Sequence, residues 1–386
     1  MTTMTLKRGG AAVVGVAESD LGQVAPHMTP IDLMAQATVR ALDDCGLSLA
    51  DVDGVFAATA QARFAPMMLT EYLGINPTYI DGTQIGGSSF MAHLAHAAMA
   101  LQAGLCKVAL IAYGSTQRSV SRALASPPDY NPYEHPYRPF LPASAYALSA
   151  ARHMHQYGTT REQLAEVAVA ARLWAQKNPL AWDRGPLTIQ DVLAARMVSA
   201  PLGVRDCCLS LDGGGAMIVT TAERARDLPR PPVYALGMGE AVGHGSISNM
   251  PDLTTTAAAV SGPRAFAMAG LGPKDVQVLS LYDAFTICPI LFLEDLGFCA
   301  KGEGGPFVAG GAIAPGGKLA VNTNGGGLSY CHPGMYGLLG MIECVRQVRG
   351  EAGERQIAGC DVALAHGNGG VLSSQCTAIF GSQAAL

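Results

Sequence analysis

Four short segments of this sequence combine glycine with side chains that accept or donate protons, and they are the candidates for a reaction site. The first runs from Ile85 to Ala92 and opens an apolar stretch that predicts a buried helix. Free backbone N–H groups at such a start can bind an oxyanion or a carbonyl oxygen. Gly87, Ser88 and Ser89 are therefore candidates for substrate binding, although small residues in this pattern also serve tight helix packing.

The second segment, Leu281 to Phe285, lies at the end of a predicted strand and leads into a helix. Ligands bind at the carboxyl ends of strands in open parallel sheets. Tyr282 can transfer a proton there, or it can be a core residue with a satisfied hydroxyl. Asp283 can contact the substrate, but a cap on the following helix explains the same residue.

The third segment runs from Asn322 to Gly334 and places Tyr330, Cys331 and His332 between a glycine run and a proline. A histidine at such a turn can donate a hydrogen bond to a substrate oxygen. It can equally stabilise the turn itself, and the spacing favours neither role.

The fourth segment, Ala365 to Gly370, lies between two predicted strands and contributes His366 and Gly369. An ordinary hairpin with glycine at positive φ accounts for its pattern as well. The joint occurrence of the four segments, in this order, makes a reaction site the better interpretation.

The elements that would position these segments alternate between strand and helix. Continuous apolar runs predict buried strands at residues 11–17 and 107–113, and a nearly all-apolar helix at 85–104 precedes the latter. Such strands indicate a parallel sheet with helices on both faces. From about Val233 the chain repeats the order strand, helix, strand, glycine-led helix, strand. We expect two units, residues 1–232 and 233–386, with an insertion of loops and helices at about 114–201 in the first.

Composition excludes several classes of protein. Hydrophobic residues make up 49% of the 386 residues and charged residues 14%, which is typical of a globular chain with a large core. A net charge of −5 gives no footprint for nucleic acid. The ten cysteines form no CxxC pair, so we expect no zinc ribbon in this chain and reduced thiols in a cytoplasmic protein. No apolar run is long enough to span a membrane.

Taken together, the four segments resemble the thiolase superfamily, specifically its sterol-carrier and lipid-transfer type, over nearly the whole chain. Further matches lie in the middle region, at Tyr157 to Ala165, Lys177 to Pro179, Pro186 to Leu193, Pro201 to Cys208 and Asp212 to Ala216. The resemblance implies an α/β protein with the thiolase fold. In that fold two similar halves stack as five layers (αβαβα), with the two glycine-led helices at the centre.

The sequence departs from these thiolases at the residues that carry their chemistry. Their nucleophilic cysteine opens the first buried helix, where this chain has Gly87. An alignment shifted by one residue puts Ser88 there, and Ser88 has no evident base. A phenol, Tyr282, replaces the asparagine of the second motif. The histidine of the third motif remains as His332, and His366 stands where the fourth motif has a cysteine or, in the sterol-carrier type, a histidine.

This combination resembles the lipid-transfer-type retro-aldolases of bacterial steroid side-chain degradation, which cleave a β-hydroxyacyl-CoA into a ketone and a shorter acyl-CoA such as propionyl-CoA. It implies Tyr282, Tyr330, His332 and His366 as catalytic residues, with Asp283, Cys331 and Gly369 beside the substrate. It also implies a homodimer and a small partner that carries a zinc ribbon and an OB-fold, together a heterotetramer. The chain itself would bind no cofactor. Coenzyme A would enter as part of the substrate, and zinc would belong to the partner.

Two other interpretations stay open at this point. The chain can be an acyl-CoA acyltransferase of the thiolase kind whose nucleophile has moved, with Cys331 as the best candidate and Cys299 as a poor one. It can also be a non-catalytic subunit that binds acyl-CoA or lipid. Labelling of a thiol that acyl-CoA protects would favour the first, and binding without turnover would favour the second.

Overall fold

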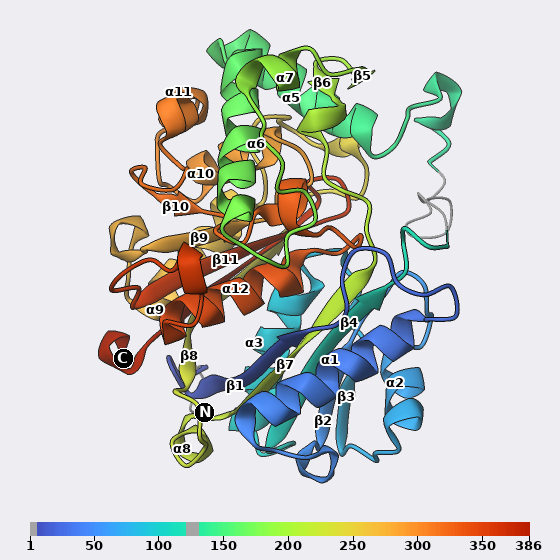
Figure 1. Cartoon of the computed structure of the whole chain (residues 1–386), viewed down its shortest axis with the longest axis vertical. Coiled ribbons are helices and arrows are strands. Elements are labelled where there is room, and N and C mark those ends of the chain that lie inside the picture. The colour runs from blue at the N-terminus through green and yellow to red at the C-terminus, as the bar shows by residue number, and fades with distance from the viewer. Residues whose placement is uncertain (1–5, 121–130) are drawn as a thin grey trace.

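The computed structural model describes residues 6–120 and 131–386, in which ten of the strands join into one sheet (Figure 1). The strands of the first half pair in the order β3-β2-β4-β7-β1. Their bounds are Ala11–Glu18 for β1, Gly54–Ala57 for β2, Tyr79–Asp81 for β3, Val108–Ser115 for β4 and Gly213–Thr221 for β7. β2 runs parallel to β3 and β4, whereas β7 runs antiparallel to β4 and β1.

The second half repeats this pattern in the order β10-β9-β11-β12-β8, with the same strand directions. Its strands are β8 (Val233–Val242), β9 (Val278–Leu281), β10 (Ala320–Val321), β11 (Val362–Gly369) and β12 (Ser374–Gly381). A short antiparallel pairing, Ala12 with Tyr234 and Val13 with Val233, joins β1 to β8 and so makes the two sheets continuous. The internal duplication that the sequence pattern predicts is therefore present in the topology.

Helices complete the five layers that the resemblance implies (Figure 1). The two glycine-led helices, α3 and α12, lie in the central layer, where they contact each other and strands of both halves. α1 and α2 pack on the first half, and α9 and α10 pack on the second. The bounds are Pro30–Cys45 for α1, Ala65–Leu73 for α2, Ser89–Gln102 for α3, Ala258–Ala269 for α9, Ile287–Asp295 for α10 and Gly337–Arg349 for α12.

Glycine permits the closest approach within the central layer. Gly337 opens α12 at the point where it meets the start of α3. A Cβ atom on Gly337 would overlap the carbonyl oxygen of Gly87 and lie 3.3 Å from Sδ of Met91. A residue with a side chain would therefore push the two helix starts apart.

The insertion between β4 and β7 lies over the second half rather than over its own sheet (Figure 1). It contains α5 (Ala143–Tyr157), α6 (Arg161–Gln176), α7 (Ile189–Leu193) and a small hairpin of β5 (Met197–Ser199) and β6 (Leu202–Gly203). Two further short helices are α8 (Ala222–Ala225) and α11 (Gly304–Val308). Residues 121–130 of the insertion lie outside the described residues. Within the described part of the chain, no helix combines the length and apolar character of a membrane span.

Candidate functional site

The ring of Tyr282 occupies the space beside Gly87, at the start of α3. A Cβ atom on Gly87 would overlap Cε2 of Tyr282, and it would lie 2.7 Å from Cζ of the same ring and 2.8 Å from the carbonyl oxygen of Asn368. Tyr282 follows β9 directly, and its backbone N–H donates to the carbonyl of His366 at 3.0 Å. No side chain at position 87 can therefore coexist with Tyr282 in this place.

The hydroxyl of Tyr282 is fixed by three groups near the start of α12. It donates to the carbonyl of Gly334 at 3.1 Å and accepts from the N–H of Tyr336 at 3.3 Å, and Nε2 of His332 lies 3.1 Å away. Because the one phenolic proton is directed at Gly334, Nε2 of His332 must carry a proton for the third bond to form. The lone pair of this histidine is then on Nδ1, which is buried and has no hydrogen-bond partner among the described residues.

Burial keeps both members of the Tyr282–His332 pair neutral. The exposed fraction is 4% for Tyr282 and 6% for His332. Loss of hydration raises the pKa of Tyr282 well above its usual value and lowers the pKa of His332 to about 4. The pair is thus a protonated phenol beside an imidazole with a free lone pair, a combination suited to moving protons within a water-poor site.

Tyr113, at the end of β4, holds the turn that carries His332. Its hydroxyl donates to the carbonyl of Pro333 and accepts from the N–H of Met335, the latter at 3.0 Å. A strand of the first half thus fixes a turn of the second half. Tyr113 does not stand out in the sequence, because its apolar neighbours make it resemble an ordinary strand residue. Its place near a strand end is the one signal that could have indicated it.

Asp283 holds a π-helical turn, Gly326–Tyr330, and does not cap α10. Its two carboxylate oxygens accept from the N–H groups of Gly327 at 2.6 Å and Leu328 at 3.3 Å. Burial raises the pKa of this carboxyl group to about 7, against the lowering effect of the two bonds. The predicted contact of Asp283 with substrate has no support in this geometry, because both oxygens are engaged with the protein backbone.

Tyr330 and Cys331 leave this turn in directions that do not lead to Tyr282. The Tyr330 hydroxyl donates to Oε1 of Glu18 at 2.9 Å, and Glu18 forms a buried ion pair with Arg346 of α12. Although burial opposes ionisation, Arg346 holds the pKa of Glu18 below its usual value. The Cys331 thiol lies 3.6 Å from the carbonyl of Asp212, and burial raises its pKa far above the usual range. A thiol in this environment is not an activated nucleophile.

The two serines of the first segment shape the start of α3. Ser88 lies 2.8 Å from the hydroxyl of Ser374 and donates to the carbonyl of Ile85 at 3.0 Å. Ser89 donates to the carbonyl of Gly86 at 2.7 Å. Neither hydroxyl has a basic partner among these contacts, which agrees with the expectation that Ser88 does not replace the missing cysteine.

His366 lies on the face of β11 opposite to α3, so the structure does not bring its imidazole together with Tyr282 and His332. Its Nδ1 lies 2.9 Å from Oγ1 of Thr377 and its Nε2 lies 2.8 Å from Oε1 of Gln375. Burial lowers its pKa to about 4. Gly369 is on the α3 face, where a Cβ atom would overlap the carbonyl oxygen of Ile85. Its role is close backbone approach.

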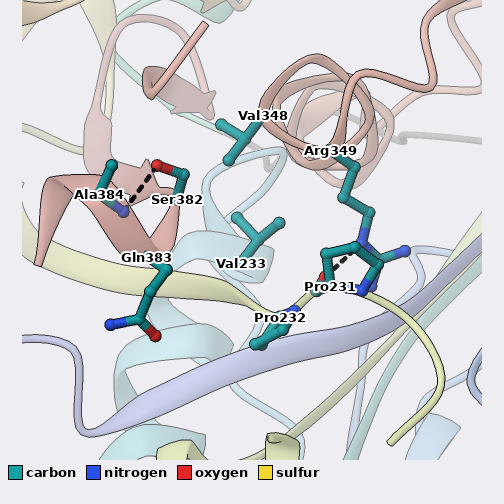
Figure 2. Close-up of a pocket in the computed structure, with 8 residues that line it drawn as sticks. All are labelled: Pro231, Pro232, Val233, Val348, Arg349, Ser382, Gln383 and Ala384. Atoms are coloured by element: carbon teal, nitrogen blue, oxygen red, sulfur yellow. Dashed lines mark hydrogen bonds between the residues drawn. The ribbon is translucent and has the colours of Figure 1, made fainter.

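A surface pocket of about 280 Å³ lies elsewhere, at the start of β8 (Figure 2). None of the predicted site residues lines it. The lining residues are Pro231, Pro232, Val233, Val348, Arg349, Ser382, Gln383 and Ala384. In residues 6–120 and 131–386, no group of three or more His, Cys, Asp or Glu side chains is arranged to hold a metal ion.

Comparisons with known proteins place these observations in a family. Residues 239–382 match the thiolase C-terminal domain-like family. The chain is 34% identical to the 17-hydroxy-3-oxo-4-pregnene-20-carboxyl-CoA lyase of Mycobacterium tuberculosis, over 95% of this chain and 98% of that one. It is 33% identical to an acetyl-CoA acetyltransferase of Methanothermobacter thermautotrophicus, over 96% and 98%. The solved structure of an Ltp2-ChsH2(DUF35) aldolase is similar with a TM-score of 0.88 at 31% identity, over 98% and 99%.

The overlap between position 87 and Tyr282 predicts strong coupling between the two residues. Gly87→Ala should lower the free energy of unfolding by about 2 kcal/mol, since the new methyl group displaces the ring. In a Tyr282→Ala background the same change should cost much less, because the space is then free. Urea unfolding of the four proteins measures both values. Equal costs in the two backgrounds would show that the ring and the position 87 side chain do not compete.

Buried histidines predict acid lability. His332 and His366 stay neutral in the folded chain down to about pH 4, whereas they protonate near 6.5 when unfolded. The unfolded state therefore binds more protons between pH 6.5 and 4, so stability should fall on acidification by up to about 3 kcal/mol per histidine. Asp283, with its pKa raised to about 7, acts in the opposite sense below that pH.

Urea unfolding at pH 7, 5.5 and 4 separates these groups. His332→Gln should make the decline shallower, and Asp283→Asn should make it steeper. A wild-type profile that is flat between pH 6.5 and 4, with both variants parallel to it, would contradict neutral burial of these side chains.

Proposed function

Because the chain belongs to the thiolase superfamily, in its lipid-transfer branch, we propose that it is a carbon–carbon lyase that cleaves a β-hydroxyacyl-CoA by a retro-aldol reaction. The observation that carries this proposal is the ring of Tyr282 in the space beside Gly87, which leaves no room for a nucleophilic cysteine at that position. The reaction therefore proceeds without a covalent acyl-enzyme intermediate.

The substrate is a steroid side-chain CoA thioester. The name of the Mycobacterium tuberculosis relative describes a thioester whose carbonyl carbon is attached to C20 and whose hydroxyl is on the neighbouring C17. That hydroxyl is on the β-carbon, so cleavage between the two carbons yields a ring ketone and propionyl-CoA. This chain matches that relative over nearly the full length of both proteins, which supports the same substrate class here.

The Tyr282–His332 pair supplies the proton chemistry. The β-hydroxyl proton passes to the free lone pair on Nδ1 of His332, the Cα–Cβ bond breaks, and its electron pair forms the thioester enolate. Tyr282 then protonates the α-carbon, and its phenolate is stabilised by the N–H of Tyr336 and by Nε2–H of His332. Return of the Nε2 proton to the phenolate leaves two neutral side chains with the histidine proton on Nδ1. Exchange of that proton back to Nε2 completes the cycle, so one proton enters the pair and one leaves it.

Tyr330 and His366 receive no direct step in this scheme. The predicted catalytic role of Tyr330 needs its hydroxyl to leave Glu18, with which it forms a charge-assisted hydrogen bond. Tyr330 therefore stabilises the turn that carries His332, and its hydroxyl satisfies the Glu18 carboxylate. Coenzyme A enters as part of the substrate, and the scheme uses no bound cofactor.

A partner subunit with a zinc ribbon and an OB-fold completes the enzyme in this proposal. The name of the similar aldolase structure pairs Ltp2 with ChsH2(DUF35). This chain also exposes large side chains in its insertion, where Tyr133, Tyr137 and Phe140 are more than half exposed. Apolar surface of this kind is typical of a face that another chain covers.

Two copies of this chain form a dimer through the free edge of β3. Ile80 on this edge strand is 51% exposed. Met67 and Tyr72 of the neighbouring α2 are exposed as well, and so is Phe64 just before that helix. An exposed edge strand flanked by apolar side chains pairs readily with a second copy. With the partner subunit, this dimer makes a heterotetramer.

An acyltransferase is the second candidate, because a relative with 33% identity over 96% of this chain carries that activity in its name. It would need a reactive thiol. Cys331 has no base among its contacts, and Cys208, near Tyr282 and Asp283, has a pKa that burial raises well above the usual range. Protection of one thiol from iodoacetamide by acyl-CoA, with loss of turnover on labelling, would favour this candidate. Binding of acyl-CoA without any turnover, even when the partner subunit is present, would favour a non-catalytic subunit.

The two tyrosines should respond differently to loss of their hydroxyls. Tyr282→Phe should slow cleavage by roughly 10²–10⁴, because it removes a proton donor and keeps the ring. It should also lower the melting temperature, since the N–H of Tyr336 and Nε2–H of His332 lose their acceptor. Tyr330→Phe should lower the melting temperature more and kcat less, because it leaves the Glu18 carboxylate short of a donor, at a cost of about 1–3 kcal/mol.

The measurements are release of the short acyl-CoA and thermal unfolding, on the same preparations. Tyr234→Phe is the matched control, since it removes another buried hydroxyl that bonds only to Gln383 in the described structure. The proposal fails if Cys331→Ala abolishes turnover while Tyr282→Phe keeps a near-normal rate.

Dependence on the partner is tested by co-expression. The chain alone should be poorly active or poorly soluble, and co-expression with a zinc-ribbon and OB-fold subunit should restore both properties. A triple change of Tyr133, Tyr137 and Phe140 to serine should reduce co-purification of the partner while sedimentation still shows the dimer. Full activity of the isolated chain would exclude an obligatory partner.

A further inference from the structure

A continuous row of hydrogen bonds runs through the buried side chains around His366. Oγ1 of Thr377 lies 2.9 Å from Nδ1 of His366, and Nε2 of His366 lies 2.8 Å from Oε1 of Gln375. Nε2 of Gln375 donates to Oδ1 of Asn368 at 2.8 Å, and Nδ2 of Asn368 donates to the hydroxyl of Tyr146 at 2.7 Å. We call these five residues the His366 row.

The chemistry of the groups gives the His366 row a single direction. Oε1 of Gln375 can only accept, so Nε2 of His366 carries the ring proton and Nδ1 accepts from Thr377. The amide of Gln375 then has its N–H groups free for Asn368, and the amide of Asn368 has its own free for Tyr146. The phenolic proton of Tyr146 must point away from the row, and it is directed at the carbonyl of Gly370 over 3.3 Å.

The row ends beside the proposed reaction site. Tyr146 comes from α5 in the insertion, and its ring stacks on Phe285, with centroids 4.4 Å apart. The side-chain amide of Asn368 donates to Tyr146. The backbone carbonyl oxygen of Asn368 lies 2.8 Å from where a Cβ of Gly87 would be, a point that the ring of Tyr282 also overlaps. Asn368 thus lies between the two phenols.

The His366 row contains more buried polar groups than are needed to pack the insertion against the sheet. Its members are almost fully buried, and burying amides and an imidazole is costly unless each is paired. Apolar side chains of similar volume would fasten the insertion to β11 and β12 at less cost. A fully paired row with one direction instead fixes the position of one hydroxyl and the direction of its proton.

We propose that Tyr146 is a further catalytic residue, which donates its phenolic hydrogen bond to the thioester oxygen of the substrate, and that His366 is a positioning residue that acts on it through Gln375 and Asn368. The inference rests on the proposed function for the identity of the bound thioester. When substrate binds, Tyr146 exchanges its long hydrogen bond to Gly370 for one to the thioester oxygen, which gains negative charge as the enolate forms. This new hydrogen bond is stronger in the transition state than in the ground state.

A double-mutant cycle on turnover tests this coupling. Tyr146→Phe should lower kcat about 10²-fold and raise KM only about fivefold, because it removes one donor whose bond is strongest to the developing oxyanion. His366→Leu should lower kcat about tenfold in the wild-type background and not at all in the Tyr146→Phe background. His366→Gln should recover most of the loss, since its amide N–H can replace the Nε2–H donor to Gln375. Tyr234→Phe is again the control with unchanged kcat.

Equal effects of His366→Leu in the two backgrounds would overturn the proposal, because a merely structural histidine acts independently of Tyr146. If His366→Leu does not fold, Gln375→Met interrupts the His366 row at its next member and is judged by the same criterion. Each variant is accepted for kinetics only when its melting temperature lies well above the assay temperature.

A binding measurement keeps this proposal separable from the lyase proposal. The probe is a saturated acyl-CoA without a β-hydroxyl, which has the thioester and cannot be cleaved. Tyr146→Phe should weaken its binding about fivefold, and His366→Leu should weaken it only while Tyr146 is present. If the wild type cleaves no β-hydroxyacyl-CoA, the lyase proposal fails, and the assignment of Tyr146 and His366 is then decided by this binding cycle alone. Unchanged binding and unchanged turnover in Tyr146→Phe would overturn it.

Discussion

The competition for space beside Gly87 is the constraint on which the rest of the site depends. Three backbone segments converge there: the starts of α3 and α12, and the end of β11. Glycines at 87, 337, 367 and 369 allow this convergence, because a Cβ atom at any of them would meet backbone or a buried side chain. Within this glycine framework, one bulky group fits, and in this chain it is the phenol of Tyr282. The ring of Tyr282 fills the space that a cysteine side chain at position 87 would need, so the chain can have the phenol or the nucleophile but not both.

The two phenols of the second and third motifs differ in their electrostatic surroundings. Tyr282 is bonded to neutral groups, an imidazole and backbone atoms, so its proton can move without separating a buried ion pair. Tyr330 is bonded to an ionised carboxylate that Arg346 compensates. Deprotonating Tyr330 would place a second negative charge beside Glu18, at a high cost in a buried setting. Position in a motif therefore does not by itself decide which tyrosine performs proton transfer.

Local signals in the sequence predicted much of the fold. The strands at residues 11–17 and 107–113 were expected within two residues of the bounds of β1 and β4, because continuous apolar runs are typical of buried strands. The repeated order of strands and helices predicted the duplicated topology. The π-helical turn Gly326–Tyr330 was not predicted, because it depends on Asp283, more than forty residues earlier in the chain. Tyr113 was missed for the same reason, since its partners lie in the other half.

The orientation of His366 shows the limit of reading a site from a motif. Because side chains alternate along a strand, His366 and Gly367 must face opposite sides of the sheet. Which of the two faces the reaction site follows only from the packing of β11 against α3. Gly367 and Gly369 face α3, so the imidazole of His366 lies on the other face of β11, where it is bonded to Thr377 and Gln375. Its hydrogen bonds lead toward Tyr146 in the insertion, a residue that no motif in the sequence had indicated.

Tyr113 and Glu18 also have a consequence for how the molecule folds. Both belong to strands of the first half, yet Tyr113 shapes the turn at Pro333 and Glu18 neutralises Arg346, which are in the second half. A separated second half would lack the carboxylate that pairs with Arg346 and the hydroxyl that holds the turn at Pro333. We infer that neither half is a self-sufficient folding unit, despite their shared topology. Fragments of this chain should gain native structure only by reassociation, and unfolding should be a single cooperative transition.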